Sequence, residues 1–539
     1  MGYQRKIEIM DTTLRDGEQT SGVSFLPSEK LQIAKWLLEE LKVDRIEVAS
    51  ARVSEGEMEG VKRITQWASE KGFLDRVEVL GFVDTPASVD WITAAGGKVL
   101  NLLTKGSLNH LIHQLRKTQA QHFQEIQECV RYARSQGQCV NVYMEDWSNG
   151  MRNSQEYTMD LIGMLSELGV RRIMLPDTLG LLNPREVSHF IRLITTEFPD
   201  THFDFHAHND YDLSVANVLE AIHNGVSGIH TTVNGLGERA GNAPLESITA
   251  VIKDFTDFKL NIRENKIYRV SKLVEQFSGQ HIPANKPVVG ENVFTQTAGI
   301  HADGDNKKNL YFNDLMPERF GRQRKYALGK TSGKANIVKN LQELGISLDP
   351  DELVKVTQRI IELGDKKERV TTEDLPYIIS DVLQNNSISH NIFIEGYNLS
   401  HSKGLKPTVQ LKINIYGESY EEGASGDGQY DAFMNALSKI YKSIHQKLPK
   451  LTNYHVTIPP GGKTDAFVET VITWDYGRIF KTKGLDSDQT VAALKATEKM
   501  LNIIEQLDKG NTSPIKGQEI NPETENTTLY GNEHRAVAG

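Results

Sequence analysis

The sequence lacks the features that mark secreted, membrane and nucleic-acid-binding proteins. Only two of its 539 residues are cysteine, Cys129 and Cys139, too few for a disulfide framework. No apolar run approaches the length that crosses a bilayer. The formal charge is −10, so no basic excess favours nucleic acid or an anionic membrane. A strand is predicted from Ile7 on, so we expect no signal peptide and a cytoplasmic location.

The first half of the chain alternates strand and helix patterns. Short apolar runs typical of buried strands are separated by amphipathic helical patterns, such as residues 28–41, which follow a start signal at Pro27–Ser28. Eight repeats of this alternation predict a TIM (β/α)₈ barrel over residues 1–260, with a doubly wound open sheet as the alternative. The predicted strands are 7–13, 45–50, 76–83, 98–104, 140–146, 172–178, 201–208 and 228–235.

The alternation stops after the predicted barrel. Residues 261–385 have helical patterns around an irregular stretch, 286–313, which carries His301 and Asp303. A loop of that length inside an ordered region is usually functional or disordered. Its apolar residues and the pair His301 and Asp303 favour function, so we predict linker subdomains that contribute to the active site.

The remaining part contains a weak duplication. Within residues 386–507, the segments 417–441 and 477–501 both have a strand, a Gly/Asp turn and a helix pattern. This repeat predicts an α+β module with pseudo-twofold symmetry. The polar residues 508–539 predict a disordered tail.

Polar side chains gather where the predicted barrel strands end, which is the face on which such barrels carry their chemistry. His206 and His208 lie two residues apart on a strand and therefore face the same side. With Asp16 they predict a site for Mn²⁺, Zn²⁺, Co²⁺ or Fe²⁺, and for Mg²⁺ with added waters; hydrogen-bonded core histidines are the alternative. The other polar groups are Arg15, Tyr143, Glu145, Asp177, Thr178, Asn234 and the glycine-rich run 235–242.

Each of these side chains has two interpretations. Arg15 could neutralise a neighbouring carboxylate, or it could face an oxygen that gains negative charge during a reaction. Tyr143 and Glu145 share a face, and Glu145 is either an acid–base group or a salt-bridge partner. The hydroxyl of Thr178 could bind a carboxylate, or the residue could simply end a strand.

Three segments resemble signature segments of one enzyme family. MDTTLRDGEQTSG (10–22), FHAHNDYDLSVAN (205–217) and NGLGERAGNAPLE (234–246) are similar to segments of the isopropylmalate, homocitrate and citramalate synthases. The resemblance covers about residues 5–505, and residues 386–507 look like the family's allosteric amino-acid-binding, dimer-forming domain. It implies an acyltransferase and a homodimer.

The resemblance also implies a chemistry. Acetyl-CoA would be the co-substrate, and a divalent metal, Mn²⁺ first, would be held by Asp16, His206 and His208 and would chelate an α-keto acid. Arg15 would stabilise the alkoxide that forms. His301, in one subunit or donated by a partner, would take a proton from the acetyl methyl group; Tyr311 would lie nearby and Glu145 on the barrel side.

The choice of keto acid depends on the space left for its side chain. By resemblance Leu80, Leu103 and Tyr143 would contact that side chain, where isopropylmalate synthases carry smaller or polar residues. These three residues predict that the substrate is pyruvate rather than 2-oxoisovalerate, unless the leucines are ordinary core residues. Segments 140–154 and 319–334 also resemble the members that use pyruvate.

The regulatory interpretation is separate from the catalytic one. We expect isoleucine as the feedback ligand, and the glycine-rich segment 458–470 is either an effector loop or an ordinary strand connection. A C–C lyase and a non-catalytic amino-acid sensor are the alternatives from other functional classes.

Overall fold

The computed structural model describes residues 5–305, 310–344, 346–365, 370, 372–383, 391–457, 468–477 and 479–510. Its residues cluster into two compact units, 1–327 with 331–339 and 328–330 with 340–539. Each unit is described by itself. The predicted tail from residue 511 on and residues 458–467 of the predicted effector loop lie outside the described residues.

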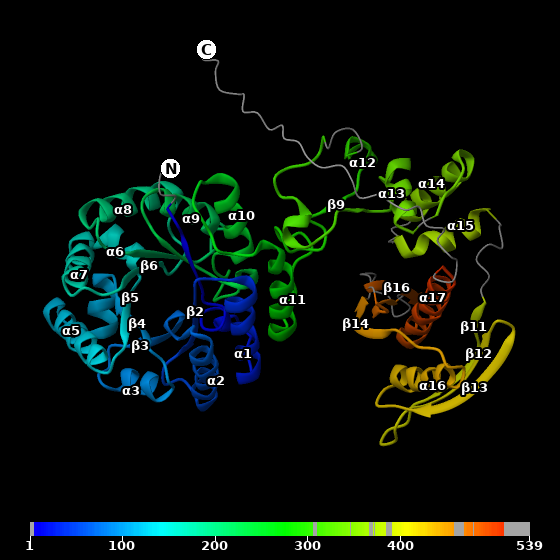
Figure 1. Ribbon diagram of the computed structural model, residues 1–539, viewed down its shortest axis with the longest axis horizontal. Helices are drawn as coiled ribbons and strands as arrows, with labels where there is room; N and C mark the ends of the chain where they lie inside the picture. Colours follow the sequence, from blue (N-terminus) through cyan, green and yellow to red (C-terminus); the bar gives the residue numbers. More distant parts are fainter. Residues whose placement is uncertain are drawn as a thin grey trace, which may run out of the picture. The chain divides into compact units, whose positions relative to one another are not determined.

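The first unit contains the predicted barrel. Its eight strands are parallel and close into a ring, with β1 hydrogen-bonded to both β2 and β8 (Figure 1). The TIM-barrel prediction is therefore confirmed, and the open sheet is excluded. The strands are β1 (Glu8–Asp11), β2 (Arg45–Ser50), β3 (Val77–Phe82), β4 (Val99–Lys105), β5 (Cys139–Glu145), β6 (Arg172–Asp177), β7 (Phe203–Ala207) and β8 (Gly228–Thr231).

Helices surround the ring of strands (Figure 1). The main ones are α1 (Pro27–Lys35), α2 (Glu55–Lys71), α3 (Ala87–Ala94), α5 (Gln119–Ser135), α6 (Trp147–Asn153), α7 (Gln155–Glu167), α8 (Pro184–Glu197), α9 (Ser214–His223) and α10 (Leu245–Phe255). The predicted helix 28–41 needs one correction: it begins at Pro27, and Trp36–Leu41 winds as a π-helix ending at Lys42, whose φ is 69°. This wider turn keeps Leu37, Leu38 and Leu41 buried.

Alternate strand residues point to opposite sides of the barrel wall, so neighbouring residues of one strand lie in different surroundings. Ile9 on β1 packs outward with the helices, whereas its neighbour Met10 lies in a small separate cluster. Arg45 forms a buried charged layer with Glu78 and Asp204, at 2.9 and 2.5 Å. Two residues further along the same strands stand Glu47, Leu80 and His206. The strands thus carry the candidate functional side chains one layer above a buried ion network.

The segment after the barrel belongs to the first unit up to Ala327. It contains α11 (Ile267–Ser278), α12 (Gly299–Asp305) and a two-stranded parallel sheet of β9 (Thr295–Gln296) and β10 (Lys325–Tyr326). Arg319 fixes this segment to the barrel side by ion pairs with Asp254 and Glu264, at 2.8 and 2.7 Å. The helices α13 (Lys334–Leu344), α14 (Pro350–Asp365) and α15 (Leu375–Leu383) follow.

The second unit contains the predicted duplication, and each half is larger than predicted. Each half has three antiparallel strands followed by a helix, instead of the single strand, turn and helix of the pattern. Both helices pack into one shared core with residues of both sheets. The halves are β11 (Ile392–Ser400), β12 (Thr408–Ile415), β13 (Glu418–Ser425) and α16 (Gln429–Ser443), then β14 (Lys450–Thr457), β15 (Val468–Asp475), β16 (Ile479–Asp486) and α17 (Gln489–Gly510).

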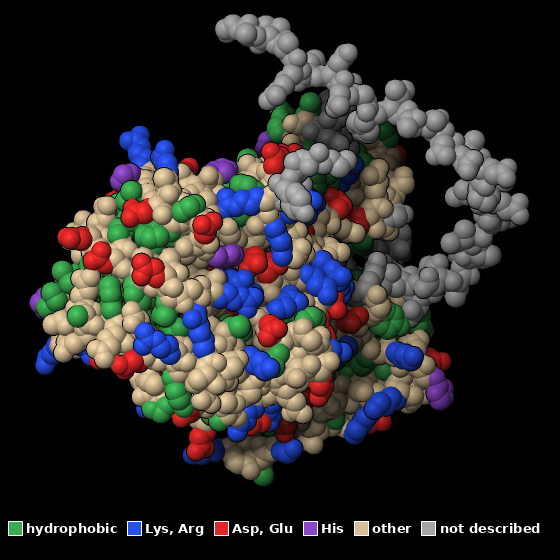
Figure 2. Space-filling view, turned by 60° about the vertical axis from the view of Figure 1, so that its left-hand side comes forward, with side chains coloured by type: hydrophobic (Ala, Val, Ile, Leu, Met, Phe, Trp, Pro, Cys, Tyr) green, Lys and Arg blue, Asp and Glu red, His purple; other side chains and the backbone are tan. Residues whose placement is uncertain are grey.

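Among the described helices, none is long and apolar enough to span a bilayer. On the face in Figure 2, basic and acidic side chains are intermingled.

Candidate active site

A tight turn after β1 places Arg15 and Asp16 at the mouth of the barrel. The backbone N–H groups of Arg15, Asp16 and Gly17 all donate to the carbonyl oxygen of Thr12, and the Asp16 N–H also reaches the Thr12 hydroxyl. Asp16 is 2% exposed. The turn therefore holds a carboxylate and a guanidinium side by side in a buried position.

Asp16, His206 and His208 converge on one point. Asp16 Oδ2 lies 3.1 Å from His206 Nε2 and 3.9 Å from His208 Nε2, and the two Nε2 atoms are 3.3 Å apart. β7 carries His206, and His208 follows it just beyond the strand end. The sequence prediction that these three side chains meet is confirmed.

The protonation states of this cluster suit a cation. Burial lowers the pKa of His208 to about 4, so its imidazole is neutral near pH 7 with a lone pair available. Burial acts to raise the pKa of Asp16, but Arg15 and His206 outweigh it and hold that pKa below its usual value. Asp16 Oδ1 and the Nδ1 atoms of both histidines are buried without a hydrogen-bond partner among the described residues. This donor set fits a divalent transition metal ion.

Asn242 is a further candidate ligand that sequence reasoning missed. It forms an isolated antiparallel bridge with His208 and is 2% exposed. Its Nδ2 donates to the Leu236 carbonyl at 3.1 Å, while its buried Oδ1 has no partner among the described residues. An amide oxygen suits the harder divalent ions. The sequence contained a signal for it, because Asn242 ends the glycine-rich run 235–242, which follows a predicted barrel strand.

Arg15 is fixed by a carboxylate on the second strand. Its Nε donates to Glu47 Oε2 at 2.5 Å, and its Nη2 donates to the Tyr143 hydroxyl at 3.3 Å. Glu47 also accepts from Thr12 and Asn101, at 2.8 and 2.7 Å. Burial acts to raise the pKa of Glu47, but Arg15 and Asn101 outweigh it and lower the pKa, so Glu47 is a carboxylate. Sequence reasoning missed Glu47, although a Glu inside the apolar run RIEVAS was a signal.

The three predicted pocket residues lie in one cluster inside the barrel. Leu80 and Tyr143 pack with Met10 and Met174, and Leu103 packs against this group at its edge. The cluster is separate from the large core between strands and helices. The Tyr143 ring also contacts the Arg15 guanidinium, 5.6 Å from ring centroid to Cζ. The apolar side chains therefore lie beside the polar group that would meet the substrate.

Two other predicted residues have structural partners. Glu145 forms an ion pair with Lys105, its register neighbour on β4, which is the salt-bridge alternative of the prediction. The Thr178 hydroxyl accepts a 2.9 Å bond from the Asp146 backbone, and its carbonyl accepts from Arg239. Among the described residues, neither makes a hydrogen bond or ion pair with Arg15 or with the candidate ligands.

His301 and Tyr311 lie side by side. Their ring centroids are 4.3 Å apart with the ring planes tilted by 41°, and His301 is part of α12. Among the described residues, neither makes a hydrogen bond, ion pair or ring contact with Arg15 or the candidate ligands. Their predicted catalytic role stays a prediction.

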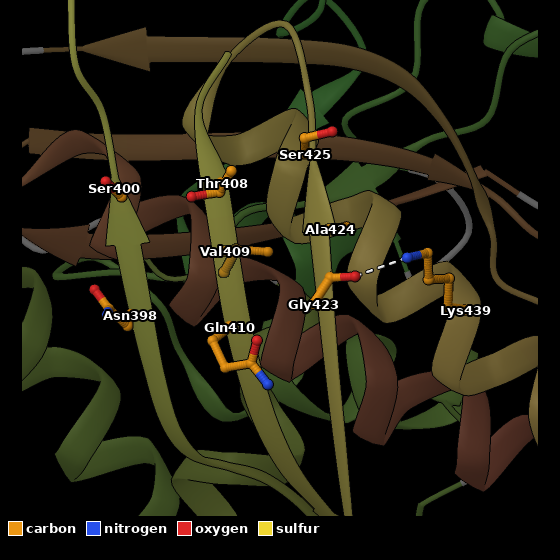
Figure 3. Close-up of a pocket in the computed structure, with 9 residues that line it drawn as sticks. All are labelled: Asn398, Ser400, Thr408, Val409, Gln410, Gly423, Ala424, Ser425 and Lys439. Carbon is orange, nitrogen blue, oxygen red and sulfur yellow. Dashed lines mark hydrogen bonds between the residues drawn. The ribbon is translucent and has the colours of Figure 1, made fainter. Parts of the chain in front are cut away.

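A cavity lies in the second unit. A hollow of about 490 Å³ lies across β11, β12 and β13 (Figure 3). Its lining is mostly polar and includes Asn398, Ser400, Gln410 and Lys439, and the Lys439 amine donates to the Gly423 carbonyl at 2.7 Å.

Comparisons with known proteins cover nearly the whole chain. Residues 6–274 match the HMGL-like family, 288–368 the homocitrate synthase post-HMGL domain-like family, and 369–505 the LeuA allosteric (dimerisation) domain. The (R)-citramalate synthase of Methanocaldococcus jannaschii is 33% identical over 502 residues, 92% of this chain and 99% of that protein. The 2-isopropylmalate synthase of the same organism is 33% identical over 506 residues, 93% and 95% of the two chains. A solved HMG-CoA lyase from Bacillus subtilis has a TM-score of 0.45 at 21% identity, covering 52% of this chain and 97% of that one.

Proposed function

The chain belongs to the family of citramalate and 2-isopropylmalate synthases, and from this premise we propose that it condenses acetyl-CoA with pyruvate to give (R)-citramalate and CoA. Family membership supports an acetyl-CoA-dependent condensation by an acyltransferase-type enzyme, without naming the keto acid. The two named relatives are equally similar, so identity alone does not choose the keto acid. We also propose that this reaction is the first step of a pyruvate route to isoleucine, and that it takes place in the cytoplasm.

One observation supports pyruvate: the apolar cluster beside Arg15 is already filled. Leu80 and Tyr143 are 5% and 2% exposed, and Leu103 closes the cluster at its edge. A methyl group needs little space there, whereas the isopropyl group of 2-oxoisovalerate would overlap these side chains. Overpacking of this kind typically costs about 1–3 kcal/mol, enough to shift the preference between substrates by tenfold or more.

The predicted ligands define how the keto acid would be held. Asp16, His206 and His208 would bind the divalent metal, Mn²⁺ first among Mn²⁺, Mg²⁺, Co²⁺ and Zn²⁺, with Asn242 as a further oxygen donor. When bound, the metal supplies Lewis-acid polarisation of the ketone. Arg15 has its Nε committed to Glu47, while its Nη contacts, to Tyr143 at 3.3 Å and to Asp16 at 3.4 Å, are longer. Those Nη–H groups would donate to the substrate oxygen that becomes anionic.

The reaction also needs a base for carbon–carbon bond formation and a water molecule for hydrolysis of the thioester. We propose that His301, whose ring contacts that of Tyr311, takes the proton from the acetyl methyl group; the resulting carbon attacks the ketone of pyruvate, and the alkoxide that forms takes up a proton. Water then hydrolyses the thioester and releases CoA. The dimerisation domain in the second unit supports donation of His301 from a partner subunit. The ion pair with Lys105 makes Glu145 the weaker candidate for proton transfer.

The second unit would carry the regulation. Its match to an allosteric domain supports an amino-acid effector, and isoleucine is the one expected from the proposed reaction. The hollow across β11–β13 offers mainly polar groups, and Val409 and Ala424 are its apolar lining residues. An isoleucine side chain would find few partners there, so we do not place the effector in this hollow.

The alternatives are separated by one assay. Release of the CoA thiol is followed after mixing the protein, Mn²⁺ and acetyl-CoA with pyruvate, 2-oxobutyrate or 2-oxoisovalerate. Fastest release with pyruvate supports the proposal. Fastest release with 2-oxoisovalerate supports a 2-isopropylmalate synthase, which is the alternative because a relative of that name is equally similar to this chain. A C–C lyase or a non-catalytic sensor would release no thiol that depends on a keto acid.

A further inference from the structure

His230, on β8, is buried between the candidate metal site and the apolar pocket and has no role in the chemistry proposed above. Its side chain is fully buried. Its ring meets the His206 ring and the Tyr143 ring edge-on, with centroid distances of 5.4 Å in both cases. It thus touches both a candidate ligand and the pocket wall.

Two hydrogen bonds define the orientation of the imidazole. Nε2 lies 3.0 Å from Asp204 Oδ2, and Nδ1 lies 3.0 Å from the Tyr143 hydroxyl. Asp204 also accepts from Arg45 at 2.5 Å and contacts His202 at 3.0 Å. The 2.5 Å ion pair with the buried Arg45 guanidinium makes Asp204 a carboxylate, which only accepts hydrogen bonds.

The fixed acceptor at Asp204 decides the direction of both bonds. Because Asp204 can only accept, the ring proton of the neutral imidazole lies on Nε2, and Nδ1 is left as an acceptor. The Tyr143 hydroxyl then donates to Nδ1, which leaves its oxygen lone pairs for the Arg15 Nη2–H at 3.3 Å. Glu47 Oε2 is a second possible acceptor for Tyr143, but it is further away, at 3.3 Å, and already accepts from Arg15 and Thr12.

We propose that His230 is a positioning residue that locks the Tyr143 side chain and thereby sets the size of the keto-acid pocket. The inference rests on the proposed function, because it concerns the selectivity of that reaction. With its hydroxyl tied to His230, the Tyr143 ring cannot move aside for a larger substrate. Without that tie the ring can yield, and a keto acid with one more methylene fits.

Two substitutions of His230 each remove one of its two hydrogen bonds and retain the other. His230→Asn retains an oxygen near the position of Nδ1 and loses the reach to Asp204. His230→Gln places its amide nitrogen near the position of Nε2 and loses the acceptor for Tyr143. The measured quantity is the ratio of kcat/KM for pyruvate to kcat/KM for 2-oxobutyrate. We expect His230→Gln to lower this ratio by about tenfold, the lower end of what a pocket discriminates per methylene, and His230→Asn to keep it near the wild-type value.

The control variants separate positioning from a general loss of structure. His202→Gln disturbs the same Asp204 carboxylate without touching Tyr143, and we expect an unchanged ratio. Tyr143→Phe should lower the ratio as His230→Gln does, and the double variant should show no further drop. The proposal is overturned if His230→Gln keeps the wild-type ratio of the two kcat/KM values. If His230→Gln does not fold, the same ratio in Tyr143→Phe decides, and a wild-type value there overturns the proposal. No thiol release by the wild-type protein with any keto acid would instead refute the proposed function.

Discussion

The Arg15 guanidinium binds Glu47 more closely than it binds its sequence neighbour Asp16: the nearest N–O distances are 2.5 and 3.4 Å. Arg15 is therefore anchored from the second strand, and the Asp16 carboxylate turns toward the two histidines. This separation answers the question raised by the adjacent cation and carboxylate of the sequence. Arg15 is anchored by Glu47, and Asp16 is a candidate metal ligand.

The anchor can be tested through stability. Glu47→Gln leaves the Arg15 cation buried without its carboxylate, and breaking a buried ion pair from one side costs about 3–5 kcal/mol. We expect a loss in that range in the free energy of unfolding, measured by urea denaturation. Glu59→Gln is the matched control, because the Glu59–Arg63 pair is exposed and worth at most about 1 kcal/mol. Equal effects of the two variants would contradict the anchoring role.

A second stability prediction concerns Asp11, which is fully buried on β1. Burial raises its pKa from 3.8 to about 7. A raised folded-state pKa means that the folded protein holds the proton more tightly, so this contribution to stability is complete below pH 3.8 and is lost as the pH rises to about 7. Asp11→Asn stays neutral, and its stability relative to wild type should rise across this window by up to about 4 kcal/mol. Urea unfolding from pH 4 to pH 8 tests this; a stability difference between the two proteins that does not change with pH would refute it.

Substrate selectivity should follow the volume of the pocket wall. The double change Tyr143→Ser and Leu103→His introduces the residues that the resemblance places in isopropylmalate synthases. We expect kcat/KM for 2-oxoisovalerate to rise by at least about tenfold relative to pyruvate, because the overlap with the isopropyl group is removed. A keto-acid panel with acetyl-CoA measures this ratio. Unchanged selectivity would show that the cluster of Leu80, Leu103 and Tyr143 is ordinary barrel core.

Donation of His301 across a dimer can be tested by mixing inactive subunits. His301→Ala and Asp16→Asn should each abolish thiol release. In a mixed dimer one site would combine an intact Asp16 with an intact His301 from the partner, so random exchange should restore about a quarter of wild-type activity. No recovery after subunit exchange, checked by mass spectrometry, would place His301 in the same subunit as the barrel it serves.

Much of the barrel was predictable because its signals are local. Each strand is a short apolar run, each helix has its own periodicity, and polar groups at the strand ends of a parallel barrel meet on one face. The meeting of Asp16, His206 and His208 could therefore be predicted before any distance was known. The boundaries were less accurate: β7 ends at Ala207, and His208 lies beyond it because it pairs with Asn242.

The contacts that sequence reasoning missed depend on barrel closure and register. Glu47 meets Arg15 and Tyr143 only when strands 1, 2 and 5 share one interior, and His230 meets Tyr143 from strand 8. The pairing of Glu145 with Lys105 follows from the β4–β5 register, which no sequence pattern specifies. A charged residue inside an apolar strand was the usable signal for Glu47.

We propose that Asp16, His206 and His208 bind a divalent metal that the condensation requires. Mn²⁺ binding to chelator-treated protein, followed by electron paramagnetic resonance, tests it most directly, with Glu145→Gln as the control at the same barrel mouth. We predict one site per chain, weakened by more than about 100-fold in Asp16→Asn and retained in the control, together with thiol release that stops on chelation and returns with Mn²⁺. Equal Mn²⁺ affinity in Asp16→Asn and wild type, or full turnover in the presence of the chelator, would contradict the account.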